Sequence, residues 1–245
     1  MNKNTYKKIS QNKGQIAILI DPENSFKEDS LITLLNKIEK AKVDFIFIGG
    51  STVSKKEFET SINIISKHTK LPIVIFPGSH NQISKKADAL LYLSLLSGRN
   101  PDYLIGHHVQ SASELINMDI EIIPTGYILI DGGNLSTVAY VSQTTPIPRD
   151  QISIIKNTAI AGVLQGKKLL YFDAGSGAMK SIPPAIIKEL LFLETPIIVG
   201  GGIKSIKEIE NLKSSGVNVI VIGNHIEENH DFLNEIKEYK EKQTI

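Results

Sequence analysis

The chain has 245 residues, a formal net charge of +1 and no cysteine. This length suits one α/β barrel with a full hydrophobic core, and it excludes disulfides and cysteine-bound metals. The near-neutral charge argues against a broad nucleic-acid surface, so no nucleic-acid partner is expected. The polar residues 1–15 do not resemble a signal peptide, and the apolar runs are too short to cross a membrane. We therefore expect a soluble, cytoplasmic protein without a transmembrane segment, which allows a transient contact with a membrane surface.

Short runs of β-branched and other apolar residues recur along the whole chain. They predict eight strands, at Ile16–Ile20, Asp44–Ile48, Ile73–Phe76, Ala89–Leu93, Ile122–Ile130, Leu169–Phe172, Ile197–Val199 and Val219–Ile222. Continuous apolar runs of this kind are typical of parallel strands that are covered on both faces.

Amphipathic stretches lie between these strands. They predict helices at Ser30–Lys42, Lys55–Lys67, Ser205–Ser214 and Asp231–Lys240. The lysine-rich residues 237–242 are expected to form a solvated helix face. Eight strands with crossovers suit either a closed barrel or a long doubly wound sheet, and the length and strand count favour a single (β/α)8 TIM barrel domain over residues 1–245.

The segment Asp131–Arg149, after the fifth predicted strand, is rich in Gly, Ser, Thr and Pro. A connection of this length usually carries function or disorder rather than packing. His107 and His108 stand where the chain enters a predicted helix, and we expect them to be solvated or hydrogen-bonded rather than part of a metal or acid–base site.

Catalytic groups of such barrels lie at the carboxyl ends of the strands. The first strand ends in Asp21-Pro22, where a carboxylate suits Mg²⁺ or caps a turn. The second ends in Gly49-Gly50-Ser51, in which two glycines allow a ligand close to the backbone. Ser51 then offers a hydroxyl to that ligand, or it caps the following helix.

The last three strands end in glycine-rich loops. The sixth is followed by the richest segment, Tyr171-Phe172-Asp173-Ala174-Gly175-Ser176-Gly177-Ala178, and the next two end in Gly200-Gly201-Gly202 and Gly223-Asn224. Exposed amides at helix N-termini after the last strands of a barrel form a common phosphate site. We therefore expect phosphate-binding loops after strands six to eight, against the alternative of tight turns that merely require glycine.

These segments occur in the order and approximate spacing of the geranylgeranylglyceryl phosphate synthase family, which the chain resembles from Asp21 to Asn224. The most specific element is the Tyr-x-x-Ala-Gly-Ser-Gly-Ala run. The resemblance implies a barrel prenyltransferase that joins geranylgeranyl diphosphate to the C3 hydroxyl of sn-glycerol 1-phosphate, forming the ether bond of archaeal-type lipids and releasing diphosphate. A related bacterial group with a heptaprenyl donor lacks this run. A homo-oligomer is expected.

The resemblance also implies the roles of individual residues. Asp21 and Ser51 match the Mg²⁺-binding positions. The positions that match the glycerol phosphate pocket are Tyr171, Phe172, Asp173, Ala174, Gly175, Ser176, Gly177, Gly201, Gly202, Gly223 and Asn224. Asp173 stands where the family usually has glutamate, so its carboxylate reaches one methylene less far. It is the candidate catalytic residue, because a carboxylate there is suited to accept the proton of the acceptor hydroxyl.

Two other functions remain open at this point. A phosphosugar isomerase or lyase on the same barrel would share the phosphate loops and use Asp21 and Asp173 as acid and base. A phosphate-ligand-binding barrel without turnover would share them as well, and fold-level analogy does not separate the three.

Overall fold

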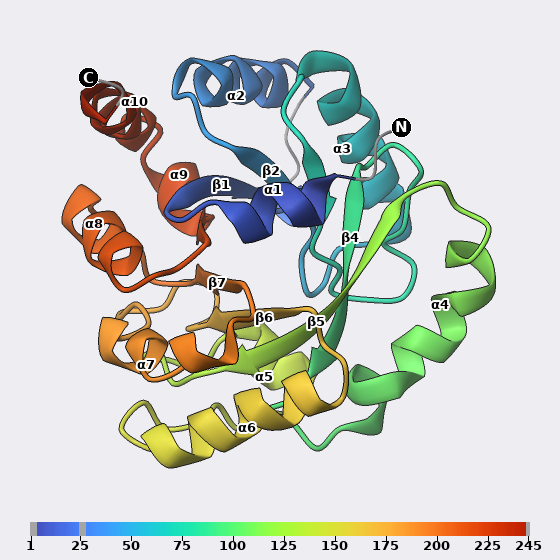
Figure 1. The fold of residues 1–245 in the computed structure, drawn as a ribbon. Helices are drawn as coiled ribbons and strands as arrows, with labels where there is room; N and C mark the ends of the chain where they lie inside the picture. The colour runs from blue at the N-terminus through green and yellow to red at the C-terminus, as the bar shows by residue number, and fades with distance from the viewer. Residues whose placement is uncertain (1–3, 25–27, 244–245) are drawn as a thin grey trace.

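The computed structural model describes residues 4–24 and 28–243, which form a closed barrel of eight parallel strands (Figure 1). The strands are β1 (Gln15–Ile20), β2 (Phe45–Ile48), β3 (Ile73–Ile75), β4 (Ala89–Leu95), β5 (Glu121–Leu129), β6 (Leu169–Asp173), β7 (Ile197–Gly200) and β8 (Val219–Ile222). The barrel closes where β8 pairs with β1, with Ile220 opposite Ile16. All eight predicted strands and the TIM-barrel fold are confirmed.

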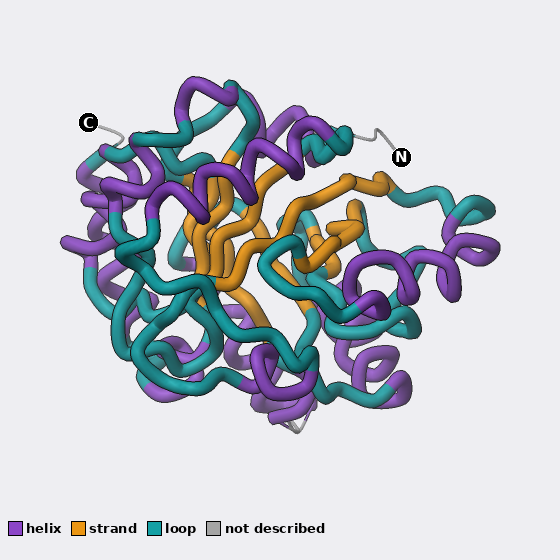
Figure 2. Tube along the Cα trace, turned by 90° about the horizontal axis from the view of Figure 1, so that it is seen from below, coloured by secondary structure: helices purple, strands orange, loops and turns teal. Residues whose placement is uncertain are grey.

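Helices surround the strands, which gather at the centre of the molecule (Figure 2). They are α1 (Thr5–Gln11), α2 (Glu28–Lys40), α3 (Lys55–His68), α4 (His107–Leu115), α5 (Thr137–Val141), α6 (Ile152–Leu164), α7 (Pro184–Lys188), α8 (Ile206–Ser214), α9 (Asn224–Glu228) and α10 (Phe232–Lys242). The four predicted helices are confirmed within two residues at either end. A short π-helix, η2 (Asp102–Gly106), leads into α4, and the 3-10 turns are η1 (Pro22–Asn24) and η3 (Leu191–Leu193).

The hydrophobic core has two layers because successive residues of a strand face opposite sides of the sheet. One cluster lies between strands and outer helices, and the other fills the inside of the barrel. Ile9 of α1 is fully buried. It belongs to the inner cluster together with Ala17, Phe45 and Val219, which lie near the starts of β1, β2 and β8. Helix α1 therefore closes the amino end of the barrel, which leaves the carboxyl end for a ligand.

Two expectations about surface segments are corrected in part. The segment Asp131–Arg149 is ordered on the barrel, because it contains α5, capped by Ser136, and Ile147 forms a bridge with Ile130. Val138 of this segment lines the pocket, so the expectation that the segment carries function is not contradicted. Lys240, in the lysine-rich end of α10, is not simply solvated, because its side chain is only 18% exposed and its Nζ lies 2.5 Å from Asp44 Oδ2. The described helices include none that combines the length and the apolar composition needed to span a bilayer.

Candidate active site

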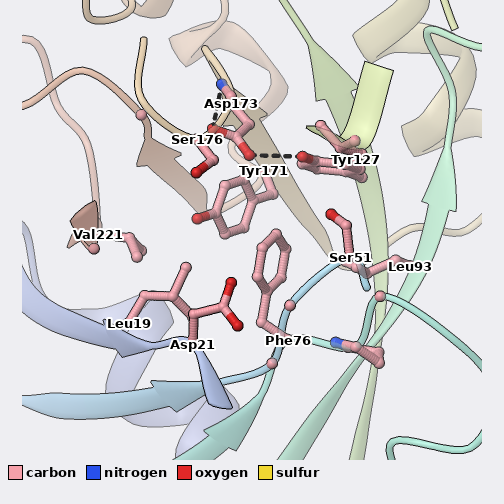
Figure 3. A pocket seen from close by; sticks show the side chains of 18 of the residues that line it. Leu19, Asp21, Ser51, Phe76, Leu93, Tyr127, Tyr171, Asp173, Ser176 and Val221 are labelled. Carbon is pink, nitrogen blue, oxygen red and sulfur yellow. Dashed lines mark hydrogen bonds between the residues drawn. The ribbon is translucent and has the colours of Figure 1, made fainter. Parts of the chain in front are cut away.

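A deep pocket opens at the carboxyl ends of the strands (Figure 3). Most of the predicted site residues line it: Asp21, Ser51, Tyr171, Asp173, Gly175, Ser176, Gly177, Gly201, Gly202, Gly223 and Asn224. Phe172 and Ala174 do not, since both side chains are buried in the outer cluster behind the sheet. The alternation of β6 explains the difference, because Tyr171 and Asp173 point inward when Phe172 points outward.

Asp173 is a buried carboxylate held by two hydrogen bonds. Tyr127, on β5, donates its hydroxyl to Asp173 Oδ2 at 2.6 Å, and the backbone N–H of Gly175 donates to Oδ1 at 2.8 Å (Figure 3). Burial raises the pKa of Asp173 above its ordinary value, although both hydrogen bonds oppose the rise. Burial, and then the charge of Asp173, raise the pKa of Tyr127 well above its usual value, so this phenol remains a donor.

Three aromatic rings pack against one another inside the barrel, and one of them, Tyr127, holds this carboxylate. Phe76, just after β3, stacks on Tyr171 with ring centroids 4.7 Å apart, and Tyr127 meets both rings edge-on. A Cβ on Gly200 would lie 2.5 Å from the hydroxyl oxygen of Tyr171. The first glycine of the triple glycine is therefore needed to make room for this tyrosine, a packing role rather than a ligand role.

The loops after β6, β7 and β8 meet beside Asp173. Gly201 and Gly202 have φ of +84° and +70°, and a Cβ on Gly201 would lie 2.8 Å from both Asp173 Oδ1 and the Gly175 nitrogen. The Ser176 hydroxyl donates to Asn224 Oδ1 at 2.9 Å, which joins the first loop to the third. Residues of all three loops line the same pocket, and their glycines leave the backbone open to close approach by a phosphate.

The N-terminus of α8 is partly occupied by side chains of its own first turn. Ser205 caps it by accepting from the Glu208 N–H, and the Glu208 carboxylate accepts from the Lys204 N–H and the Ser205 hydroxyl. These bonds occupy the N–H groups of Lys204 and Glu208.

The loops that carry Asp21 and Ser51 lie against each other. A Cβ on Gly50 would lie 2.4 Å from Asp21 Oδ1, so the carboxylate packs directly on the backbone next to Ser51. Ser51 does not cap α3, because Ser54 does so in a capping box with Glu57. Asp21 Oδ1 accepts from the Glu23 N–H at 3.0 Å, so its turn-forming role is real, and its carboxylate still lines the pocket.

The Asp21 carboxylate and the Ser51 hydroxyl are oxygen donors that suit an Mg²⁺ ion bound jointly by the protein and a phosphate substrate. Mg²⁺ is commonly bound by one or two carboxylates, with waters and substrate phosphates completing the octahedron. Burial, and then the charges of Glu23 and Glu57, raise the pKa of Asp21, against the opposing hydrogen bond from Glu23. A nearby cation would reverse this rise. The described residues hold no cluster of three or more His, Cys, Asp or Glu side chains placed for a metal, so an all-protein cage is not expected.

An apolar branch extends the pocket along β4 and beneath α4, which the sequence did not reveal. It is lined by Phe76, Ile83, Leu90, Tyr92, Leu93, Leu95, Tyr103, Leu115 and Val138. Four of these residues come from β4 and two from the loop between β3 and β4, and the others come from η2, α4 and α5, so no single local sequence pattern connects them. The branch is the one part of the pocket suited to a hydrocarbon chain.

His107 and His108 both line this branch. The ring of His108 stacks on Tyr92 at 3.9 Å, and its Nε2 lies 2.6 Å from the Leu93 carbonyl oxygen. The ring of His107 packs between His80, at 5.7 Å, and Tyr103, at 4.9 Å. Burial lowers the pKa of both histidines. The expected hydrogen bond is present for His108. The ring nitrogens of His107 make no hydrogen bond of normal geometry to the described residues, although Gln110 lies near enough to raise the pKa of His107 against the effect of burial.

The geometry defines a class: a (β/α)8 barrel with a phosphate-sized glycine cradle, a buried carboxylate and an adjoining apolar branch. The PcrB family model matches residues 7–241. A geranylgeranylglyceryl phosphate synthase of Zunongwangia profunda is 45% identical over 217 residues, 88% of this chain and 92% of that one. That of Flavobacterium johnsoniae is 46% identical over 219 residues, 89% and 90% of the two chains.

A solved structure has the same fold. It is (S)-3-O-geranylgeranylglyceryl phosphate synthase from Thermoplasma acidophilum in complex with its substrate sn-glycerol-1-phosphate. The TM-score is 0.88 at 32% identity, over 97% of this chain and 96% of that chain. The chain therefore belongs to the PcrB family of geranylgeranylglyceryl phosphate synthases, and the family resemblance of the sequence is confirmed.

Proposed function

We propose that the protein is a prenyltransferase that joins geranylgeranyl diphosphate to the C3 hydroxyl of sn-glycerol 1-phosphate. The observation that carries the proposal is one pocket in which a buried carboxylate stands between a glycine cradle and an apolar branch. Each part suits one portion of the two substrates: the cradle a phosphate, the carboxylate a hydroxyl, and the branch an isoprenoid tail.

The acceptor would be held at the loops after β6, β7 and β8. Backbone amides of the turns at Gly177, Gly202 and Asn224 would bind its phosphate, and Asp173 would accept a hydrogen bond from the reacting hydroxyl. In the reaction the C3 oxygen bonds to C1 of the prenyl chain while the C1–O bond to diphosphate breaks. The hydroxyl proton passes to Asp173, whose pKa, raised by burial, makes it a stronger base than an exposed aspartate.

The donor would lie across β1 to β4. Asp21 and Ser51 would hold Mg²⁺, which when bound neutralises charge on the departing diphosphate. The prenyl tail would occupy the apolar branch, where burial of hydrocarbon stabilises binding by about 25 cal/mol per Å². Residues of the branch orient the tail so that C1 faces the acceptor oxygen, and they keep water from the allylic centre.

Asp173, which is one methylene shorter than the family's glutamate, is held in place by a side chain of the neighbouring strand. Tyr127 reaches Asp173 Oδ2 from the neighbouring strand and fixes the carboxylate at the rim of the cradle. We propose Tyr127 as a positioning residue that the sequence did not single out. In the sequence, only its position within the long apolar run Ile122–Ile130 indicated that Tyr127 lies in a strand.

The lining of the pocket also helps to judge the two alternatives, a phosphosugar isomerase or lyase and a phosphate-binding barrel without turnover. A phosphosugar isomerase or lyase would use Asp21 and Asp173 as facing acid and base, and both do line the pocket. Such a substrate has no hydrocarbon chain to fill the branch between β4 and α4, which favours prenyl transfer. A binding protein without turnover would have no use for a buried base beside the cradle.

The proposed activity involves two further contacts, one with a membrane surface and one between copies of the chain. Ile105, Val109 and Ile116 form an exposed apolar stripe on η2, α4 and the turn after α4, on the segment whose inner side lines the branch. We propose that this stripe touches a membrane surface transiently while a prenyl diphosphate enters. Figure 1 shows α4 at the periphery of the barrel, where such a contact is accessible. We also propose a homo-oligomer that covers the exposed apolar residues Ile154 and Leu164 of α6.

The test is incubation of the purified protein with radiolabelled sn-glycerol 1-phosphate, Mg²⁺ and prenyl diphosphates of several chain lengths. The expected result is a lipid-extractable ether product with geranylgeranyl diphosphate, absent after chelation of the metal. The preferred donor length is read from the same series. Absence of product with every donor, in a protein that still binds sn-glycerol 1-phosphate, would favour a binding barrel. Conversion of a phosphosugar without prenyl donor would favour the isomerase or lyase.

A further inference from the structure

Gln82, in the loop between β3 and β4, is a fully buried polar side chain that does not line the pocket. Its own N–H donates to the Ser79 carbonyl oxygen at 3.2 Å, so its backbone is held in a turn. Its side-chain amide makes hydrogen bonds to backbone groups of two loops. A buried amide with partners on both its oxygen and its nitrogen fixes the backbone to which it bonds.

The amide nitrogen of Gln82 holds the loop after β2. It donates to the Gly50 carbonyl oxygen at 2.8 Å and to the Val53 carbonyl oxygen at 3.3 Å. Gly50 and Val53 stand on either side of Ser51-Thr52 in the chain. Ser51, a proposed ligand of Mg²⁺, therefore lies between two carbonyl groups that the same side chain holds.

The amide oxygen of Gln82 ties this loop to the one after β3. It accepts from the Gly78 N–H at 3.0 Å and, at the longer distance of 3.5 Å, from the Gly50 N–H. A Cβ on Gly78 would lie 2.1 Å from the Gly50 carbonyl oxygen, so the two backbones are in contact. Both glycines line the pocket, and one buried side chain therefore holds two pocket loops together.

The Asp21 carboxylate packs on the same glycine. A Cβ on Gly50 would lie 2.4 Å from Asp21 Oδ1. Gly50 is thus in contact with Asp21, bonded to Ser51 and hydrogen-bonded by Gln82. Because glycine has wide conformational freedom, its place here depends on these contacts. A shift of Gly50 would change the separation of the Asp21 carboxylate and the Ser51 hydroxyl.

We infer that Gln82 is a positioning residue that sets the spacing of Asp21 and Ser51 for Mg²⁺ by holding the segment from Gly50 to Val53. The inference rests on the proposed function, in which these two residues bind the metal of the donor diphosphate. Gln82 acts through the backbone and touches neither metal nor substrate. Such support matters because Mg²⁺ tolerates little deviation from octahedral geometry.

Two variants test the inference in the full chain. Gln82→Glu keeps the shape but turns a carboxylate oxygen toward the carbonyls of Gly50 and Val53, and Gln82→Met keeps the length without any hydrogen bond. In both, the Mg²⁺ concentration for half-maximal prenyl transfer should rise about 10- to 100-fold. The KM for sn-glycerol 1-phosphate should stay near the parent's, because other loops form the glycine cradle. Melting curves establish which variants fold, and Gln82→Met carries the test if the buried glutamate prevents folding.

A second measurement does not depend on turnover. Calorimetric titration with geranylgeranyl diphosphate, without acceptor, is carried out with and without Mg²⁺. Mg²⁺ should tighten donor binding to the parent, and both variants should lose most of this increment. Binding without Mg²⁺ should be equal in parent and variants, because the apolar branch is unchanged.

Asn218 offers a matched control at the amino end of the barrel. It is also fully buried, and its amide nitrogen donates to the carbonyl oxygens of Ile9, Ser10 and Asn12. Asn218→Asp therefore makes the same chemical change away from the pocket. It should keep the parent's Mg²⁺ requirement even where its melting temperature falls.

The inference is overturned if folded variants need no more Mg²⁺ than the parent and keep the full increment in donor binding. It is also overturned if Asn218→Asp raises the Mg²⁺ requirement as much, or if the acceptor KM rises in the same proportion, since either result would show general damage. A parent that binds the donor more tightly with Mg²⁺ but forms no product would contradict the proposed function alone, and the calorimetric comparison then decides on Gln82. Donor binding to the parent that is indifferent to Mg²⁺ would overturn the role of Gln82 as well.

Discussion

At the scale of single residues, Asp173 is the group on which the proposed chemistry depends. Replacement by asparagine keeps the shape but removes the base. We expect Asp173→Asn to retain the KM for sn-glycerol 1-phosphate within a few-fold and to lose about two to four orders of magnitude in kcat. Asp173→Glu restores the family's residue and should keep measurable activity. Steady-state kinetics check this, and an asparagine variant as fast as the parent would show that Asp173 only orders the loop.

Tyr127 should act through Asp173 on the pH profile. Because the folded-state pKa of Asp173 is raised, kcat/KM should fall as pH decreases through that pKa, above the range of an exposed carboxyl. The Tyr127 hydrogen bond opposes this rise, so Tyr127→Phe should move the acid limb to higher pH. The same raised pKa means that this group's contribution to folding stability is present at low pH and is lost as pH rises through the folded-state pKa. An unmoved limb with unchanged kcat would remove Tyr127 from the mechanism.

Asp21 is expected to act through the metal. Asp21→Asn should lower turnover by orders of magnitude and raise the Mg²⁺ concentration required for half-maximal activity. Binding of sn-glycerol 1-phosphate should persist, because the glycine cradle is formed by other loops. A circular dichroism spectrum and melting curve like the parent's would establish that the fold is intact. Near-normal activity with the parent's Mg²⁺ dependence would contradict the assignment.

At the scale of elements, the loops after β7 and β8 use glycine for different reasons. Gly201 has positive φ, and its Cβ would strike Asp173 and the Gly175 nitrogen, whereas Gly223 has φ of −117° and ordinary room for a Cβ beside Leu19. Gly201→Ala should therefore cost about 1–3 kcal/mol in stability and raise the acceptor KM strongly. Gly223→Ala should fold normally with a smaller change in KM. Thermal melting curves and steady-state kinetics with varied acceptor concentration test this difference. Equal losses of stability and equal rises in KM for the two variants would contradict the geometry.

At the scale of the whole molecule, α6 suggests how copies of the chain associate. It is apolar on several sides, yet Ile154 is 49% exposed and Leu164 82% exposed. Such a helix is normally covered. We expect the parent protein to be a homo-oligomer by light scattering and an Ile154→Glu/Leu164→Glu variant to shift toward monomer. Val109→Glu on α4 is the control, and a monomeric parent would refute the expectation.

The sequence by itself determined the barrel, because each strand carries a continuous apolar run and each strand end carries its own loop chemistry. It also placed Asp21, Ser51, Asp173 and the glycine loops at one rim, since the carboxyl ends of parallel strands meet there. Ile197–Val199 followed by three glycines shows both signals within a few residues. Such information is local, so a single chain displays it.

The tertiary structure decided everything that depends on residues distant in the chain. Tyr127 and Asp173 are 46 positions apart, and their hydrogen bond arises only from the register of β5 and β6. The apolar branch is built from separate elements. The side chain of Phe172 does not line the pocket, because the pleat of β6 points it away from the inside of the barrel. At the other end, Lys13 donates to Asn218, 205 positions away, because the barrel closes between β1 and β8. Contacts between residues of different strands and helices are properties of packing, and no spacing along the sequence encodes them.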